Sequence, residues 1–208
     1  GPHSTEEALG ALPIAESNKI PMITFGVFSD EAMDDAWSDC GIGCTPADYG
    51  YLWRVSPGQE HHVSALYAHI SSEGHSNVGI LYDSGKDHTA IATGLSSALS
   101  STCSEQSFPP GQTDFSSEIA ALSGCDAVVI LAESTDGAAI LEELYVQGLE
   151  IAKIGGHGLG DIVMTNIVSD PAHLANLTGV RMGIDHDVAE YDHELKYVYN
   201  MNYHTDLP

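Results

Sequence analysis

The chain has 208 residues, of which 43% are hydrophobic and 17% charged, and its formal net charge at pH 7 is −24. This amount of apolar material supports a folded core and excludes global disorder. The acidic excess repels nucleic acids and anionic membrane surfaces, so we expect neither as a partner. The sequence has no apolar run of about 18 residues, so we expect no direct membrane insertion of this segment.

The acidic side chains are scattered along the chain, with 30 Asp and Glu against 6 Lys and Arg. A surface of this kind repels itself at low ionic strength and is relieved by salt. Adaptation to a salty exterior is one interpretation, and an ordinary acidic secreted protein is the other. The chain starts at Gly1 without a methionine, so we expect a processed chain or a fragment.

The first fifty residues predict one helix, one strand and a loop. The helix is expected over 5–17, the strand over 21–25, and a loop rich in Asp, Gly and Cys over 30–50. Ser4 and Glu7 have the Ser-x-x-Glu spacing of a capping box, in which side chains satisfy the free N–H groups that begin a helix.

Strands and helices then alternate from residue 51 to about 170. Short apolar runs at 78–82, 127–131 and 151–154 are typical of strands buried on both faces of a parallel sheet. Apolar residues at helical spacing predict the intervening helices, and these series begin at Val63, Ile91, Phe115 and Leu141. The pattern predicts right-handed βαβ units and an α/β fold with a doubly wound parallel sheet.

Other local signals mark the ends of these elements. Ser56 and Gln59 have the spacing of a second capping box, and Gly74 stands where a helix C-cap glycine belongs. A further strand is predicted over 179–184 and a helix over 190–203.

Six stretches, in order and spacing, resemble the type I periplasmic binding proteins. This family comprises branched-chain amino acid and amide binders of ABC transporters and related ligand-binding regions of receptors. The stretches are GPHSTEEALGALPIAESNKIPMIT, YLWRVSPGQEHHVSALYAHI, VGILYDSGKDH, PPGQTDFSSEIAALSGCDAVVIL, DGAAILEELYVQGL and GVRMGIDHDVAEYDHELKYVYNMNYHTDLP.

The resemblance implies a type I periplasmic-binding-protein-like fold, of which this chain holds mainly lobe two plus part of lobe one. Residues 1–50 would be part of lobe one, 51–178 lobe two, and 179–208 the end of lobe two and the crossing back toward lobe one. Because family members are longer, we expect a fragment or a reduced form.

The resemblance implies ligand contacts from two loops of lobe one. Ser4 and Thr5 match a small hydroxyl residue ahead of a helix, where free N–H groups and the helix dipole suit a carboxylate. Plain helix capping by Ser4 is compatible with this role. Gly26 and Ser29 match a second contact loop, in which Phe28 is bulkier than the family's small polar residue.

Lobe two would contribute Asp87, Glu133 and His157, each of which follows the carboxyl end of a predicted strand. Typical branched-chain amino acid binders carry two aromatic residues and an acid at these positions. Two carboxylates facing a helix N-terminus would suit a zwitterion or a cation-bearing solute. The other interpretation is that these are ordinary solvent-exposed polar loop residues of a very acidic chain.

The four cysteines allow three pairings. Cys103 and Cys125 each begin a predicted strand, and in a parallel sheet these starts would be neighbours at one edge, within disulfide reach. Cys40 and Cys44 could close a small CGIGC loop, or could be free thiols or metal ligands.

We expect no metal and no cofactor. Acidic and histidine residues between Asp185 and Glu194 match no metal-binding loop and are interpreted as an exposed acidic loop. Sequence signatures of serine hydrolases, P-loop enzymes, dinucleotide enzymes and zinc proteases are missing, so we do not expect an enzyme.

The expected function is that of an extracytoplasmic solute-binding protein, located in the periplasm, at the cell surface or outside the cell. It would deliver a small polar solute, such as an amino acid or amide, to the permease of an ABC transporter. A ligand-sensing receptor ectodomain is the second hypothesis. The third is a secreted structural protein that reuses the fold.

Overall fold

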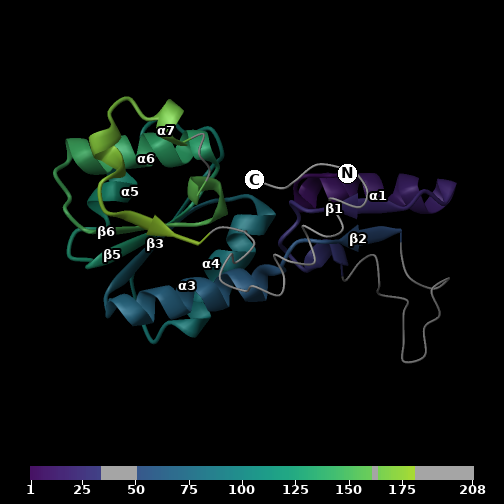
Figure 1. The fold of residues 1–208 in the computed structure, drawn as a ribbon, viewed down its shortest axis with the longest axis horizontal. Helices are drawn as coiled ribbons and strands as arrows, with labels where there is room; N and C mark the ends of the chain where they lie inside the picture. Colours follow the sequence, from purple (N-terminus) through teal and green to yellow (C-terminus); the bar gives the residue numbers. More distant parts are fainter. Residues whose placement is uncertain (34–50, 161–163, 181–208) are drawn as a thin grey trace, which may run out of the picture.

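A computed structural model describes residues 1–33, 51–160 and 164–180 of the chain (Figure 1). Within these residues, two parallel sheets are covered by helices, one of five strands and one of two strands. The sequence prediction of an α/β fold with a doubly wound parallel sheet is therefore confirmed.

The five-stranded sheet forms the core of lobe two, with the strand order β4-β3-β5-β6-β7 and parallel pairing throughout. Its strands are β3 (Val78–Asp83), β4 (Thr102–Phe108), β5 (Ala127–Leu131), β6 (Ala152–Gly155) and β7 (Leu177–Gly179). The order reverses between β3 and β5, so the loops that follow these two strands diverge at the carboxyl edge of the sheet. A crevice at such a reversal is where ligands bind in open α/β sheets.

Helices cover both faces of this sheet (Figure 1). The helices are α3 (Gln59–Glu73), α4 (Lys86–Ala98), α5 (Ser116–Ala120) and α6 (Ser134–Val146). Every residue of β5 is buried, and successive side chains of a strand point to opposite faces. Val128 and Ile130 pack with α5 and α6, whereas Val129 packs with α3 and α4. Burial on both faces explains the uninterrupted apolar run.

The described part of lobe one contains α1 (Thr5–Asn18), β1 (Met22–Thr24) and β2 (Leu52–Arg54). The two strands pair in parallel, and Ala8 and Leu12 of α1 pack against Leu52. Because β2 pairs with β1, the two-stranded sheet extends to Arg54. The domain bounds of 1–50, 51–178 and 179–208 stay predictions.

The helix ends test the capping predictions. The Ser4 hydroxyl accepts the N–H of Glu7 at 3.3 Å, which confirms this cap. Gly74 ends α3 with a φ of 77°, which a glycine adopts without a Cβ clash. The Ser56 prediction is wrong, because Gly58 is the N-cap of α3 and the Ser56 hydroxyl instead donates to Val27 O at 3.4 Å. The Ser56 hydroxyl thus bonds to a lobe-one carbonyl instead of capping α3.

The last described segment runs along the outer edge of lobe two. It contains the short helices η1 (His157–Gly160), α7 (Met164–Ile167) and η2 (Pro171–Leu174), followed by β7. The strand predicted over 179–184 overlaps β7 only at Gly179, where β7 ends, and residues 181–184 lie outside the described part of the chain. The helix predicted over 190–203 and the cluster from Asp185 to Glu194 lie outside the described residues.

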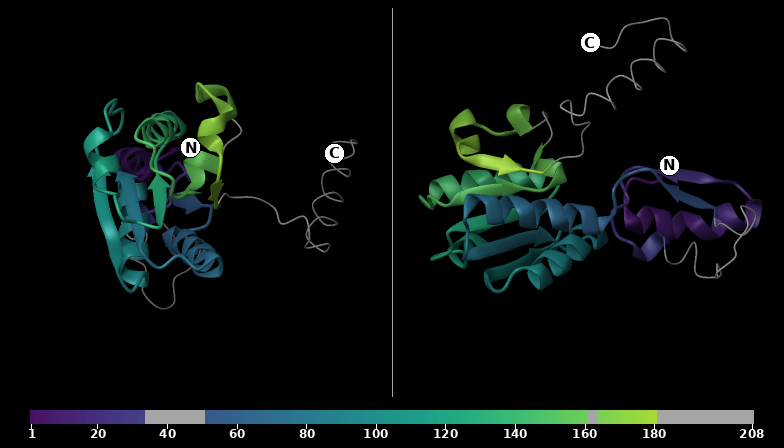
Figure 2. Two further views of the ribbon diagram at one scale, coloured as in Figure 1. Left: turned by 90° about the vertical axis from the view of Figure 1, so that its left-hand side faces the viewer. Right: turned by 60° about the horizontal axis from the view of Figure 1, so that its bottom comes forward.

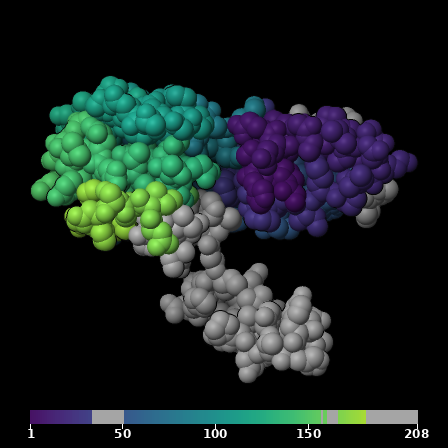
Figure 3. All heavy atoms as spheres, turned by 90° about the horizontal axis from the view of Figure 1, so that it is seen from above, coloured from purple at the N-terminus to yellow at the C-terminus, as the bar shows by residue number. Residues whose placement is uncertain are grey.

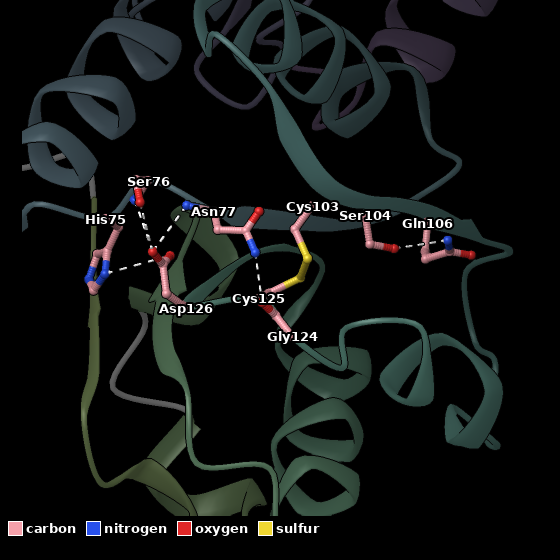
Figure 4. The surroundings of a disulfide bond; sticks show 9 residues. All are labelled: His75, Ser76, Asn77, Cys103, Ser104, Gln106, Gly124, Cys125 and Asp126. Atoms are coloured by element: carbon pink, nitrogen blue, oxygen red, sulfur yellow. Dashed lines mark hydrogen bonds and ion pairs between the residues drawn. A yellow bond between two sulfur atoms is a disulfide. The ribbon is translucent and has the colours of Figure 1, made fainter.

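A disulfide joins Cys103 and Cys125, with their Cα atoms 5.6 Å apart (Figure 4). The predicted pairing is confirmed, but its reason was incomplete, because β3 lies between β4 and β5. Cys103 sits where the register between β3 and β4 shifts. Beside the bond, β3 carries Gly79, and a Cβ there would lie 3.2 Å from Cys125 Sγ and 2.5 Å from Leu122 Cδ2. The glycine provides the room for this packing. Cys40 and Cys44 lie outside the described residues.

The two lobes form separate bodies that meet across a narrow junction (Figures 2 and 3). The N-terminus of α1 and the loop after β1 lie on the side of lobe one that faces α4. No helix in residues 1–33, 51–160 and 164–180 is long and apolar enough to cross a membrane.

Candidate functional site

A pocket of about 600 Å³ lies at this junction and is lined from both lobes. Lobe one contributes the start of α1 and the loop after β1. Lobe two contributes the loop between β3 and α4 and the residue that precedes α6. These are the carboxyl ends of strands and the amino ends of helices, where parallel α/β sheets place ligand sites.

On the lobe-one side, Ser4 and Gly26 line the pocket, as do Glu6 and Phe28. The Ser4 hydroxyl is used for capping α1. Glu6 Oε1 accepts the backbone N–H of Lys86 at 2.6 Å and thereby links the first turns of α1 and α4. The nearby ammonium group of Lys86 is bound by both carboxylate oxygens of Glu31 at 2.7 Å.

Asp87 lies in the first turn of α4 and is only 8% exposed. Its Oδ2 accepts the backbone N–H of Thr5 at 2.8 Å. Its Oδ1 accepts the Thr5 hydroxyl at 2.6 Å and the backbone N–H groups of Phe28 and Ser29 at 2.7 and 2.8 Å. Four donors of lobe one thus converge on one carboxylate of lobe two, and Asp87 joins the lobes.

A buried hydrogen-bonded pair, Asp83 and His88, lines the pocket together with Asp87. His88 Nδ1 and Asp83 Oδ2 are 2.6 Å apart, and the two side chains are 10% and 4% exposed. Burial by itself would lower the pKa of the His88 imidazole. The hydrogen bond to Asp83 and the negative charges of Asp83, Glu133 and Asp87 outweigh burial, so the pKa of His88 lies above its ordinary value.

Glu133 completes the lobe-two side of the pocket. It is the N-cap residue of α6, but its side chain makes no capping hydrogen bond. The side chain is exposed within the pocket lining. Its negative charge contributes to the raised pKa of His88.

The pocket brings together four of the seven predicted ligand residues: Ser4, Gly26, Asp87 and Glu133. Thr5 and Ser29 are buried behind Asp87 and donate to it. His157 begins η1 after β6, and its side chain is not described. These assignments as ligand contacts remain predictions.

Sequence reasoning missed the Asp83–His88 pair and Glu6. Asp83 ends the apolar run of β3 and His88 follows five residues later. An acidic residue at the carboxyl end of a buried strand could have pointed to Asp83. No sequence signal could have pointed to Glu6, because its hydrogen bond to α4 joins residues 80 positions apart.

The chemistry of the pocket is acidic. Four carboxylates line it, together with two imidazoles, and no Lys or Arg is among its described lining residues. No three His, Cys, Asp or Glu side chains within the described ranges are grouped so that they could hold a metal ion. The arrangement suits hydrogen-bond donors and positive charge on a small organic molecule.

Comparison with known proteins gives one family. The family model described as periplasmic binding protein matches residues 1–184 of the chain. No curated protein matches the chain in sequence.

Solved structures resemble this one in fold. A branched-chain amino acid transporter substrate-binding protein from Streptococcus pneumoniae, in complex with isoleucine, is 16% identical with a TM-score of 0.75. A leucine-binding protein from Thermotoga maritima is 19% identical with a TM-score of 0.76. The match to each covers 99% of this chain and 57% of the other.

An extracellular ligand binding receptor from Desulfohalobium retbaense is 14% identical with a TM-score of 0.64, and the match covers 98% of this chain and 34% of that one. The present chain thus spans less than two thirds of the length of these neighbours, and at these identities the likeness concerns the fold alone.

Proposed function

This chain belongs to the periplasmic binding protein family, and we propose that it is an extracytoplasmic solute-binding protein that captures a small polar solute between its lobes. The observation that carries the proposal is the pocket of about 600 Å³ to which both lobes contribute. A solute held by two lobes at once stabilises their closed arrangement, because it binds that arrangement more tightly than the open one.

The proposal extends to an amino acid or amide-like solute and to an ABC transporter permease as partner. Two of the fold neighbours support an amino acid solute by their descriptions, which are a branched-chain amino acid transporter substrate-binding protein and a leucine-binding protein. The third, a ligand binding receptor, favours a second candidate, the ligand-sensing ectodomain of a receptor. Both candidates use the same binding module and are not enzymes.

The test is ligand-dependent stabilisation of the purified chain. A panel of amino acids, amides and small amines is screened by thermal shift and followed by calorimetry. A solute that binds only the folded state stabilises it by RT ln(1 + [L]/Kd), or about 2.7 kcal/mol at a hundredfold excess over Kd. If no member of the panel raises the melting temperature, the proposal of solute binding is wrong.

Glu133→Gln locates the site. Loss of a charge-assisted hydrogen bond of about 1.5–3 kcal/mol weakens affinity by about tenfold or more. Glu73→Gln is the matched control, because Glu73 is exposed at the end of α3 and does not line the pocket. A ligand whose affinity is equal in wild type, Glu133→Gln and Glu73→Gln binds elsewhere.

A further inference from the structure

The lobe-one donors around Asp87 form a carboxylate-binding site. Asp87 receives four donors, three on Oδ1 and one on Oδ2, all at 2.6–2.8 Å. These short distances are typical of hydrogen bonds in which one partner carries a charge.

The donors come from two separate elements and converge on one point. Thr5 is the first residue of the 14-residue helix α1, whose N-terminal N–H groups and dipole favour an anion. Phe28 and Ser29 lie in the loop after β1 and aim two successive N–H groups at the same oxygen. The acceptor comes from lobe two, 82 residues after Thr5.

We infer that Asp87 supplies, from within the chain, the carboxylate that these donors are built to bind, and that the open part of the pocket therefore accepts a cationic solute that has no carboxylate of its own. The inference about the solute rests on the proposed function. It narrows the expected class of solute from amino acids and amides to amines and guanidines.

A solute carboxylate would have to displace Asp87 from its donors. The Asp87 side chain is buried, and a buried charge without its partners is strongly unfavourable. An amino acid held by its carboxylate would therefore bind more weakly than the same molecule without one.

The groups left facing the open pocket are suited to a cation. Glu133 presents an exposed carboxylate that caps no helix. Phe25 is 55% exposed and lines the pocket, and its ring forms a T-shaped pair with the His3 ring, with the centroids 5.4 Å apart. A carboxylate and an aromatic face are the groups that recognise ammonium and guanidinium ions.

The first experiment tests the internal carboxylate without any solute. Asp87→Ala removes the carboxylate, and acetate is added to supply it. The expected result is that the melting temperature of Asp87→Ala falls and is raised again by acetate, but not by acetamide or by chloride at equal ionic strength. If Asp87→Ala does not fold alone, the refolded yield with acetate against acetamide is the readout.

Asp136→Ala is the matched control. Asp136 is also a buried aspartate in the first turn of a helix, α6, and it accepts one backbone N–H, from Gly111 at 2.9 Å. Acetate should not restore this variant. The inference is wrong if acetate does not raise the melting temperature or the refolded yield of Asp87→Ala. It is also wrong if acetate raises them equally in Asp87→Ala, Asp136→Ala and wild type.

The second experiment uses probe pairs that differ by one carboxylate: agmatine with arginine, and 3-methylbutylamine with leucine. Wild type should bind the amine of a pair about tenfold or more tightly than the amino acid, and Asp87→Ala should shift that ratio toward the amino acid by a similar factor. Equal or tighter binding of the amino acid by wild type overturns the inference. Failure of every probe with both proteins counts against the proposed solute binding, and the acetate result then decides the role of Asp87 by itself.

Discussion

Strands β5 and β1 are both short apolar runs in parallel sheets, yet they are covered to different extents. All five residues of β5 are buried between helices on its two faces. In β1, Ile23 is 59% exposed, and its register partner Trp53 on β2 is 40% exposed. An apolar run thus indicates a strand, but the number of covered faces depends on what packs against the sheet.

The two lobes also differ in how their cores are secured. Lobe two has two clusters of buried residues, one on each face of its sheet, and a disulfide. The described part of lobe one has a single cluster, built around Ala8, Leu12 and Leu52. Since burial of apolar surface is the main stabilising contribution to folding, equal substitutions should cost more in lobe two.

The largest expected difference is between Ile130→Ala and Ile23→Ala. Ile130 is fully buried in β5, so its truncation should lower the free energy of unfolding by about 2–5 kcal/mol. Ile23 is largely exposed, and its truncation should change that free energy by about 0.5 kcal/mol. Urea denaturation midpoints measure both. Equal losses would show that the outer face of β1 is covered.

Removal of the disulfide should have the next largest effect. Cys103 and Cys125 are 22 residues apart, and a loop of this size corresponds to about 3 kcal/mol of stabilisation. The double substitution to alanine should lower the denaturation midpoint accordingly. Intact mass before and after reduction and alkylation is the check on the bond itself, and alkylation of both thiols without reductant would refute it.

Two glycine substitutions compare the lobes directly. Gly79→Ala places a Cβ 2.5 Å from Leu122 Cδ2 beside the disulfide and should cost about 1–3 kcal/mol of stability. Gly10→Ala lies in α1, where a Cβ meets nothing within 4 Å, and should stabilise by about 0.5–1 kcal/mol. Thermal denaturation of the two variants should give shifts of opposite sign, and a stabilised Gly79→Ala would contradict the packing at β3.

The smallest expected effect is the pH dependence of the Asp83–His88 pair at the lobe junction. Because folding raises the pKa of His88 above its ordinary 6.5, the stability from this pair is fully present below about pH 6.5 and is lost as pH rises through the raised folded-state pKa. His88→Gln should remove this part of the pH profile. His61→Gln, at an exposed histidine of α3, should leave it unchanged, and an identical loss in both variants would exclude the pair as its source.

Much of the fold could be predicted because its signals are local. The apolar runs at 78–82 and 127–131 coincide with β3 and β5, since a strand covered on both faces needs apolar side chains at every position. The Ser4 cap was predictable because its partner Glu7 is three residues away. The Ser56 prediction failed because Ser56 bonds to Val27 in lobe one, and local spacing carries no information about that contact.

For the candidate site, the sequence predicted only which residues follow the carboxyl ends of the strands. Strand carboxyl ends placed Asp87 and Glu133 at one edge of the sheet, where both line the pocket. The partners of Asp87 were not predictable. Phe28 and Ser29 lie in the loop after β1 and Thr5 begins α1, and these residues, 58 to 82 positions away in sequence, reach Asp87 only after the lobes pack.

The sequence by itself determined the α/β class and the positions of the main strands and helices, because residue type and spacing restrict local conformation, and it favoured the Cys103–Cys125 pairing. Only the tertiary structure decided that β3 stands between the two bonded segments and that Asp87 faces lobe one. Strand order and lobe packing bring together residues that are far apart in the chain. The free energy of such contacts depends on which surfaces are buried together, and no single segment of the sequence specifies those surfaces.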